Sequence, residues 1–407
     1  NGATFLPGSL YDVVIEFQAT TLPPEYGASI TGGVNGTQDL SVFLGSNPKI
    51  KFYYASSSPN AGFVSGGLIT AAIWRSIPAP PVGEYTVRVE AESTIIHTKW
   101  TVRAPQNFGA KNVILMIGDG MSLPMVTAAR VASRGLFQGK FKEHLHMDSL
   151  ARHGLVSTSG LDAIITDSAN SASAYNSGHK TSVGALGVYP DSNDDPNDDP
   201  AVELFAELVQ RQFGMRVGIV TNTEFQDATP AAVFTHCRRR EEKEYISRLP
   251  LDGGRFTNGT RRGVPLVTAD IVIGGGNMYL TNAQQLKSSC CPEDRYLKDE
   301  YRQSGVTIAY NKTQLNEAID TGASRILGLF GSRNMDPWLN RHVYTDLASK
   351  VFTDAPDLRE SVEAALKLLA RNVLANQSPG FYLMVEGGLI DKAFATTVCM
   401  PWTRTAS

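Results

Sequence analysis

The chain has 407 residues, with 37 Lys and Arg against 40 Asp and Glu, so its formal net charge is −3. This near-neutral balance gives no electrostatic reason to expect a nucleic-acid partner. Apolar runs are too short for a membrane span, which needs about 18 or more residues. With 42% hydrophobic and 19% charged residues the composition is that of a globular protein, and the length favours two domains.

From Leu10 to about Ala104 the chain consists of short alternating stretches separated by Gly, Pro, Ser and Asn clusters. They are "YDVVIEFQA", "LSVFLG", "KIKFYYA", "GLITAAIW", "GEYTVRVEA" and "TIIHTKWTVRA". Period-two alternation at this spacing predicts strands of a small all-β sandwich, immunoglobulin-like, over residues 1–106. "APQNFGAK" is interpreted as a linker to a second domain, residues 107–407.

In the second domain, nearly continuous apolar runs alternate with segments of helical period. The runs are "NVILMIG", "MRVGIVTN", "ADIVIGGG", "RILGLFG" and "FYLMVEGG", and the helical segments include "AVELFAELVQRQF" and "LRESVEAALKLLARNVLA". This order predicts an α/β fold with a mostly parallel sheet covered on both faces, and function at the carboxyl ends of the strands. The acidic, Pro-broken "PDSNDDPNDDP" is expected to be solvated surface.

Two segments carry the first candidate residues. Asp119 stands between two glycines directly after an apolar strand, where a carboxylate can face a ligand while the backbone turns tightly. Asp is also common in turns, so a metal role stays open at this point. Ser168 follows a predicted strand end and opens a small-residue helix, at the positive end of the helix dipole. A structural N-cap serine is the alternative.

The segment "TNTEFQDATPAAVFTHCRRR" supplies Asp227 and Thr229 after a strand, then His236 and the three arginines 238–240. A guanidinium fork is the group best matched to a phosphoryl dianion. Three consecutive arginines are also typical of a solvated face, so their position does not choose among them. No Gly-x-Ser-x-Gly elbow is present, and a hydrolase triad therefore has no support.

The combination of these segments resembles the alkaline phosphatase family. "VILMIGDGM", "TDSANSASAYNSGHKT", "ALGV", "QDATPAA", "IVIGGG", "ILGLF" and "FYLMVEGGLID" occur in the family's order and spacing, from about Lys111 to Asp391. The resemblance implies a three-layer, mostly parallel sheet and hydrolysis of phosphate monoesters through a phosphoserine intermediate, with two Zn²⁺ ions and one Mg²⁺ ion. It says nothing about the segment before Ala104.

The resemblance also implies roles for the metal ligands. Ser168 matches the nucleophile that one zinc holds as an alkoxide, in place of a general base. Asp119 matches the carboxylate that bridges this zinc and the magnesium. Thr229 and Glu386 match the remaining magnesium ligands, which are oxygen donors as that hard ion prefers. Asp391 resembles a ligand of the other zinc.

The same resemblance assigns the phosphate-binding groups. Arg240 stands four residues after His236, as the family's phosphate-clamping arginine does, and Asp167 is expected to orient it. Asp227 and Lys392 match a variant of bacterial enzymes in which these residues adjust the magnesium site and the hold on phosphate. The alternative for Asp227 and Lys392 is a solvated surface pair.

The sequence departs from the family near its C-terminus. Four residues after Asp391 the family has a zinc-binding histidine, but here Ala395 stands, and no histidine follows His342. Three imidazoles of the zinc shells are thus missing, which predicts weak zinc binding, impaired turnover and exposed apolar faces that favour aggregation. When the residues after Ala393 are back-translated with degenerate codons and read two bases later, a histidine codon is permitted at position 395. We therefore hypothesise that the sequence after about Ala393 is out of frame.

Environment and partners are predicted less sharply. Asn-x-Ser/Thr sequons at Asn35, Asn258, Asn311 and Asn376 favour an extracellular or periplasmic glycoprotein, and the start at Asn1 suggests a mature form or a fragment. The cysteine pattern demands no disulfide. The family resemblance favours a homodimer. Two alternatives stay open: a non-catalytic phosphate- or magnesium-binding relative with an adhesive sandwich, and hydrolysis of phosphodiesters or sulfate esters.

Overall fold

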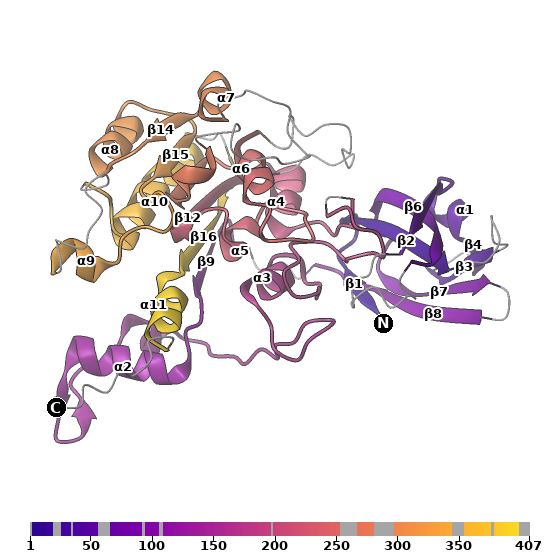
Figure 1. Ribbon diagram of the computed structural model, residues 1–407, viewed down its shortest axis with the longest axis horizontal. Helices are drawn as coiled ribbons and strands as arrows, with labels where there is room; N and C mark the ends of the chain where they lie inside the picture. Colours follow the sequence, from indigo (N-terminus) through magenta and orange to yellow (C-terminus); the bar gives the residue numbers. More distant parts are fainter. Residues whose placement is uncertain are drawn as a thin grey trace.

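The structure, a computed structural model, describes residues 2–18, 26–33, 36–55, 66–91, 94–105, 109–196, 198–252, 267–280, 297–343, 354–375 and 378–398. β-Sheets of the N-terminal region lie at one end of the molecule, and a helix-covered sheet forms its centre (Figure 1). The predicted domain boundary at 106/107 falls on residues outside the described ranges, so it stays a prediction.

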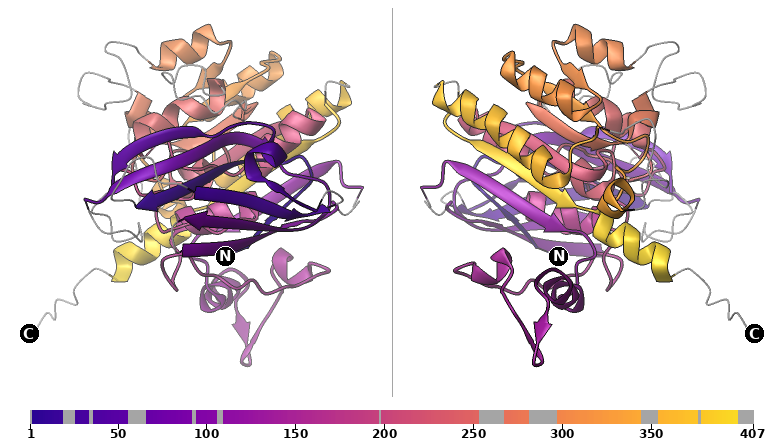
Figure 2. Two further views of the ribbon diagram at one scale, coloured as in Figure 1. Left: turned by 90° about the vertical axis from the view of Figure 1, so that its right-hand side faces the viewer. Right: turned by 90° about the vertical axis from the view of Figure 1, so that its left-hand side faces the viewer.

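The N-terminal region consists of two sheets, with strand orders β1-β8-β7-β3-β4 and β2-β6-β5. The strands are β1 (Ala3–Phe5), β2 (Leu10–Gln18), β3 (Tyr26–Gly32), β4 (Thr37–Asp39), β5 (Lys49–Tyr54), β6 (Leu68–Pro78), β7 (Gly83–Ala91) and β8 (Thr94–Val102). Pairing is antiparallel throughout except between β1 and β8. Both sheets contribute large side chains to one core, among them Trp74 and Trp100. The left-hand view of Figure 2 shows these sheets face on.

One predicted strand of this region is wrong. "LSVFLG" forms helix α1 (Leu40–Leu44), because the Asp39 carboxylate accepts hydrogen bonds from the backbone N–H groups of Ser41 and Val42. Gly45 ends the helix in the left-handed region at φ 70°. A short apolar run does not distinguish a strand from one helical turn, and the capping residues on its two sides decide.

The central sheet has six strands in the order β14-β15-β13-β12-β16-β9, all parallel. They are β9 (Asn112–Gly118), β12 (Arg216–Glu224), β13 (Ile271–Gly275), β14 (Thr307–Ala309), β15 (Ile326–Leu329) and β16 (Phe381–Gly387). Side chains alternate between two buried clusters, so Ile219 packs on one face of the sheet and Val220 on the other. The predicted parallel α/β sheet is therefore present, and only the short β14 was not predicted.

Helices cover both faces of this sheet (Figure 1). They are α3 (Ser168–Ser177), α4 (Phe205–Phe213), α5 (Ala228–Ala231), α6 (Lys243–Asp252), α7 (Leu297–Gln303), α8 (Lys312–Asp320), α9 (Trp338–His342), α10 (Leu358–Leu374) and α11 (Leu389–Val398). α2 (Leu123–Arg134) and the hairpin β10 (Leu136–Phe137) and β11 (Lys140–Phe141) follow β9, with short 3₁₀ turns at His146–Ser149 and Asn277–Leu280. No helix among the described residues is long and apolar enough to cross a membrane.

The chain before Ser168 also differs from the expectation. No strand ends there, and Ile164 and Ile165 are 89% and 83% exposed, because no neighbouring strand offers them a partner. The helix expected from Ala201 begins at Phe205 instead, since Val202 forms a β-bridge with Tyr11 of β2. This bridge ties the central domain to the N-terminal sheets.

The acidic loop, residues 190–200, is not the solvated surface that the sequence suggested. Asp191 is 8% exposed and Asp199 is fully buried. The guanidinium of Arg238 donates to both carboxylates, and Lys51 of β5 pairs with Asp198 at 2.9 Å. Cations from two parts of the chain thus neutralise the run of carboxylates, which allows burial. The loop is a junction between the N-terminal sheets and the central domain.

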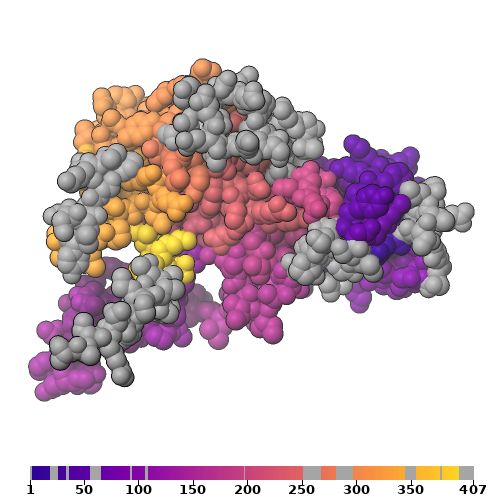
Figure 3. Space-filling view, viewed as in Figure 1, coloured from indigo at the N-terminus to yellow at the C-terminus, as the bar shows by residue number. Residues whose placement is uncertain are grey.

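Apolar side chains are exposed along one side of the central domain. Ile114 and Met116 of the edge strand β9 are 48% and 69% exposed, and Leu155 is fully exposed. Helix α2 has no buried residue and stands away from the body of the domain (Figure 3). Exposed apolar faces were expected from the sequence, while aggregation of the chain stays a prediction.

Candidate functional site

The candidate residues meet at the carboxyl ends of three neighbouring strands, β9, β16 and β12. Glu386 lies near the end of β16, in register with Thr221 of β12 and Ile117 of β9. Asp119 follows β9, and Asp227 follows β12. Carboxyl ends of parallel strands share one edge of a sheet, which is where α/β folds commonly bind ligands. The topology therefore brings together acidic groups that are far apart in sequence.

Ser168 is the first residue of α3, and its hydroxyl faces Asp119. The N-cap is Asp167, whose carboxylate accepts from the backbone N–H of Asn170 at 3.0 Å, so the alternative of Ser168 as N-cap is wrong. This leaves the Ser168 hydroxyl available to another group, and its Oγ donates to Asp119 Oδ2 at 2.8 Å. The positive end of a ten-residue helix therefore lies at this hydroxyl.

Asp391 lies against the turn that carries Asp119. Gly120 has φ 66°, and a Cβ added there would lie 3.0 Å from Asp391 Oδ1. Both the left-handed conformation and the close approach of Asp391 explain why glycine follows Asp119. The first turn of α11 thus brings Asp391 to the same edge of the sheet.

Glu386 is buried within the site. It is 1% exposed and accepts hydrogen bonds from Thr221 Oγ1 at 2.5 Å and Thr223 Oγ1 at 3.0 Å. Burial, together with the negative charges of Asp227 and Asp119, raises the pKa of Glu386 to about 7, although the hydroxyls of Thr221 and Thr223 act to lower it. A carboxylate in this environment gains from a cation beside it.

Thr229 and Tyr175 complete this part of the site. Thr229 is 2% exposed in α5, and its side chain lies beside the hydroxyl of Tyr175. Tyr175 is 39% exposed, and the negative charges of Glu386 and Asp119 are among the causes that raise the pKa of its hydroxyl. Tyr175 therefore lies near both carboxylates as well as Thr229, and its place had no signal in the sequence.

Asp227 is the centre of a cluster of cations. Arg240 contacts Asp227 Oδ1 at 2.8 Å, Lys392 contacts Oδ2 at 2.9 Å, and Lys243 contacts Oδ1 at 3.3 Å. Burial acts to raise the pKa of Asp227, but these three cations together hold it well below its usual range. Asp227 is 7% exposed, so the alternative of a solvated pair with Lys392 does not describe it.

Arg240 is also held from a second side. Its other terminal nitrogen donates to Asp167 Oδ2 at 3.0 Å, and Asp167 immediately precedes Ser168. The three consecutive arginines point to different surroundings: Arg238 enters the acidic loop, Arg239 is exposed and Arg240 joins this site. Sequence position alone could not separate them.

The oxygen donors of the site fit Mg²⁺ by their chemistry. Asp119, Thr229 and Glu386 offer carboxylate and hydroxyl oxygens, as this hard cation prefers. Zn²⁺ fits less well, because it is normally bound with His or Cys ligands and this site offers oxygen donors. Within the described ranges, no group of three His, Cys, Asp or Glu side chains is arranged to hold a metal ion of either kind. His236 is hydrogen-bonded to Glu207 at 2.8 Å, and the side chain of Ala395 lies outside the described residues.

Other predicted features lie apart from the site. His179 is hydrogen-bonded to Tyr189 at 3.0 Å, and burial lowers its pKa to about 4. Cys237 is buried. Asn311 caps α8 by accepting from the N–H of Gln314. The remaining sequons and cysteines fall outside the described residues, namely Asn35, Asn258, Asn376, Cys290, Cys291 and Cys399.

A serine hydroxyl at a helix N-terminus, a half-buried arginine and a set of oxygen donors thus share the carboxyl edge of a parallel sheet. This arrangement is typical of an α/β protein that binds an anionic ligand at this edge. The family model described as alkaline phosphatase matches residues 110–400. The chain belongs to the alkaline phosphatase family.

Individual relatives agree with this assignment. An alkaline phosphatase of Gadus morhua is 32% identical over 306 residues, which are 69% of this chain and 60% of the relative. The tissue-nonspecific isozyme of Gallus gallus is 29% identical over 324 residues, 75% of this chain and 59% of the relative. The chain therefore spans about three fifths of the length of these relatives.

Solved structures support the fold. The alkaline phosphatase of Thermus thermophilus has a TM-score of 0.52 and 26% identity, covering 70% of this chain and 50% of that chain. A cold-active alkaline phosphatase of Shewanella sp. has a TM-score of 0.50 and 26% identity, with 70% and 58% covered. The α/β fold with a parallel sheet is thereby confirmed.

Lys243 was not identified from the sequence, because it stands in no motif. Its Nζ also donates to the carbonyl of Gln226 at 3.0 Å and lies 3.6 Å from Glu224, and the side chain is 15% exposed. We expect Lys243→Met to weaken binding of inorganic phosphate about tenfold, since Asp227 would then compete more strongly for Arg240. Titration calorimetry measures the change.

Arg239→Met is the matched control for Lys243→Met, because Arg239 is exposed and carries the same charge. Its phosphate affinity should stay within about twofold of the unsubstituted chain. Equal weakening by both substitutions would show that only net charge matters. In that case the contact between Lys243 and Asp227 would have no role in binding.

Proposed function

We propose that the chain hydrolyses phosphate monoesters, with Ser168 forming the phosphoserine intermediate. The observation that carries this proposal is the position of Arg240. Its guanidinium donates a hydrogen bond to Asp167, and the next residue, Ser168, donates from its Oγ to Asp119. A phosphoryl group between Arg240 and Ser168 would have its charge matched by the guanidinium and the helix N-terminus. Its phosphorus atom would then lie beside the serine oxygen.

The residues of this chain account for binding and orientation. Asp167 and Asp227 restrain Arg240 from two sides, which reduces the entropy lost when it grips a phosphoryl group. Asp119 Oδ2 accepts the Ser168 hydroxyl hydrogen and so orients Oγ. In the transfer, the Oγ–P bond forms, the bond from phosphorus to the ester oxygen breaks, and the alcohol leaves with a proton. Water then releases phosphate from Ser168.

Mg²⁺ would be held by Asp119, Thr229 and Glu386, with Asp227 acting on that site through its charge. When bound it neutralises the carboxylates and the developing negative charge of the transfer. The family resemblance implies two Zn²⁺ ions as well, with Asp391 and Ser168 among their ligands. Since the described residues do not complete a zinc shell, we propose that turnover by this chain is impaired.

Comparison of p-nitrophenyl phosphate with bis(p-nitrophenyl) phosphate tests the proposal. With zinc and magnesium supplied at alkaline pH, we expect kcat/KM for the monoester to exceed that for the diester at least about tenfold. The reason is that a monoester dianion offers Arg240 two charged oxygens and a diester only one. Equal rates, or faster diester hydrolysis, would support phosphodiester chemistry instead.

A second candidate function is a phosphate- or magnesium-binding protein without catalysis, whose N-terminal sandwich adheres to a polysaccharide or cell surface. It is favoured by the oxygen donors of Asp119, Thr229 and Glu386, because a catalytic zinc normally takes His or Cys ligands as well. Stoichiometric phosphate binding with no monoester turnover would decide for it. An extracellular or periplasmic location and a homodimer belong to the proposal for the enzyme.

A further inference from the structure

His236 is a buried group that the proposed mechanism does not use. It is 6% exposed, and its two ring nitrogens have different partners. Nδ1 lies 2.9 Å from the carbonyl oxygen of Gly187, and Nε2 lies 2.8 Å from Glu207 Oε1. A carbonyl oxygen only accepts, so Nδ1 carries a hydrogen and donates it to Gly187. A second proton then lies between Nε2 and the Glu207 carboxylate, since two lone pairs would repel each other.

Glu207 holds the ring of His236 from helix α4. It is 3% exposed, and its second oxygen, Oε2, accepts from the backbone N–H of Leu204 at 2.8 Å. Both carboxylate oxygens are therefore engaged, one with the helix N-terminus and one with the imidazole. Because a buried network with every member bonded is rigid, the imidazole is held in one orientation.

Gly187 connects His236 to helix α3. Its N–H donates to Ser173 Oγ at 2.9 Å, and Ser173 is 1% exposed within the helix that begins with Ser168. Gly187 has φ 61°, and a Cβ added there would lie 2.9 Å from His236 Nδ1. Glycine allows both this left-handed backbone and the close approach of the imidazole.

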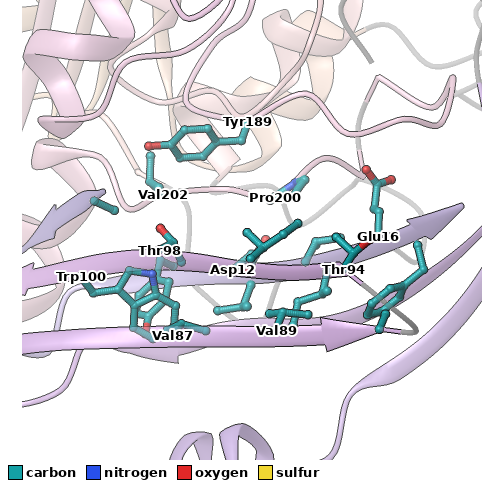
Figure 4. Close-up of a pocket in the computed structure, with 18 of the residues that line it drawn as sticks. Asp12, Glu16, Val87, Val89, Thr94, Thr98, Trp100, Tyr189, Pro200 and Val202 are labelled. Atoms are coloured by element: carbon teal, nitrogen blue, oxygen red, sulfur yellow. The ribbon is translucent and has the colours of Figure 1, made fainter. Parts of the chain in front are cut away.

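The carbonyl of Gly187 also accepts from a second donor. The N–H of Val202 lies 3.2 Å from it, and Val202 forms a β-bridge with Tyr11 of β2. Figure 4 shows Tyr189, Pro200 and Val202 beside the N-terminal strands, with which they line a cavity. Gly187 is thus tied to α3 and to the N-terminal sheets, which makes its carbonyl a fixed point for the imidazole.

The backbone of residues 236–240 runs beside that of residues 184–187. Cys237 forms a β-bridge to this segment, and the N–H of Arg240 donates to the carbonyl of Gly184 at 2.9 Å. The contact of the imidazole closes one end of the pair, and Arg240 stands at the other. Loss of that contact would let the backbone that carries the guanidinium shift relative to α3.

We propose that His236 is a positioning residue for phosphate binding, which acts through the hydrogen bond from its Nδ1 to Gly187. This bond fixes Arg240 relative to Ser168, because Gly187 is held on α3 and Arg240 lies on the paired segment. Glu207 contributes by keeping Nδ1 turned toward the carbonyl. This role rests on the proposed function, because it takes Arg240 as the group that binds phosphate.

Two substitutions of His236 separate its two hydrogen bonds. The amide of His236→Asn reproduces Nδ1 and keeps a donor to Gly187, whereas the longer His236→Gln reproduces Nε2 and keeps only the contact with Glu207. Calorimetric titration with inorganic phosphate should give an affinity within about threefold of the unsubstituted chain for His236→Asn, and at least about tenfold weaker for His236→Gln. Urea unfolding should give the opposite order, because His236→Asn leaves the buried Glu207 without its partner.

Ser173→Ala tests the same path from its other end, and it should fold because alanine is a good helix former. It removes the acceptor of the Gly187 N–H and should weaken phosphate binding at least about fivefold. Ser171→Ala is the matched control, since Ser171 of the same helix donates to Asp167, and its affinity should stay within about twofold. In the double variant of Ser173→Ala and His236→Gln the two effects should not add, because both break one path.

Amide hydrogen exchange gives a reading that needs no phosphate. The N–H groups of Cys237 and Arg240 should exchange faster in His236→Gln than in His236→Asn. Equal exchange, equal phosphate affinity of the two variants, or no phosphate binding by the unsubstituted chain would overturn the proposal. Phosphate affinities in the predicted order, without a phosphoryl group on Ser168 after turnover, would support this role and contradict the proposed function alone.

Discussion

Where the metals are bound, Ser168→Ala should lower the rate at which the chain hydrolyses p-nitrophenyl phosphate on the order of 10³-fold or more. The substitution deletes the oxygen that contacts Asp119 Oδ2 and that would carry the phosphoryl group. Alanine is also a good helix former at the first position of α3, so folding should be kept. The rate at alkaline pH with zinc and magnesium measures the effect.

Ser171→Ala provides the control for Ser168→Ala. Ser171 lies one turn further along α3 and donates to the carbonyl of Asp167 at 2.8 Å, so it is a serine of the same helix without contact to Asp119. Its substitution should change the rate by less than about threefold. If Ser168→Ala kept the rate of the unsubstituted chain, catalysis would not pass through this serine.

The second large effect is expected for stability. Arg238→Ala should lower the free energy of unfolding by about 3–5 kcal/mol, because it leaves the buried carboxylates Asp191 and Asp199 without their cation. Burial and the neighbouring carboxylates already raise the pKa of Asp191 to about 7, so this loop tolerates little further loss of positive charge. Urea unfolding at neutral pH gives the difference.

Arg239→Ala removes the same charge from the exposed neighbour and should change the free energy of unfolding by less than about 0.5 kcal/mol. The phosphate affinity of the folded Arg238→Ala chain should stay unchanged, because Arg238 contacts Asp191 of the acidic loop whereas Arg240 contacts Asp167 in the site. Similar destabilisation by both substitutions would contradict the role of the acidic loop as a junction.

The sequence predicted most of the fold where one physical signal dominated. Continuous apolar runs such as residues 381–388 belong to buried parallel strands, and their lack of alternation was sufficient to identify them. The run at residues 40–45 was misread because a run of this length suits both a strand and a helix. The contact of Asp39 with the next turn and the left-handed conformation of Gly45 separate these alternatives.

The acidic loop shows a different limit of prediction. Its composition is typical of solvated surface, and burial became favourable through Arg238 and Lys51, which are distant in sequence and pair with its carboxylates. Arg75 donates to backbone carbonyls of the loop. No local pattern records such pairing. Long-range compensation of charge could therefore not be predicted from the loop itself.

Prediction of the site was similarly uneven. The residues with a motif, such as Asp119, Ser168 and Arg240, lie together at the edge of the sheet, while their catalytic and metal-binding roles stay predictions. Lys243 and Tyr175 lie on helices, and which of their neighbours these side chains contact depends on how the helices pack in the folded chain. A single side chain on a helix carries no signal of the partner that it meets.

The most direct test of the proposed function is whether Ser168 becomes phosphorylated. The chain would be incubated with p-nitrophenyl phosphate, zinc and magnesium, quenched in acid, digested and examined by mass spectrometry. We predict one phosphoryl group on the peptide that contains Ser168, and none in the Ser168→Ala chain. Turnover of the substrate without a phosphoryl group on Ser168, or with one on another residue, would contradict the proposed mechanism.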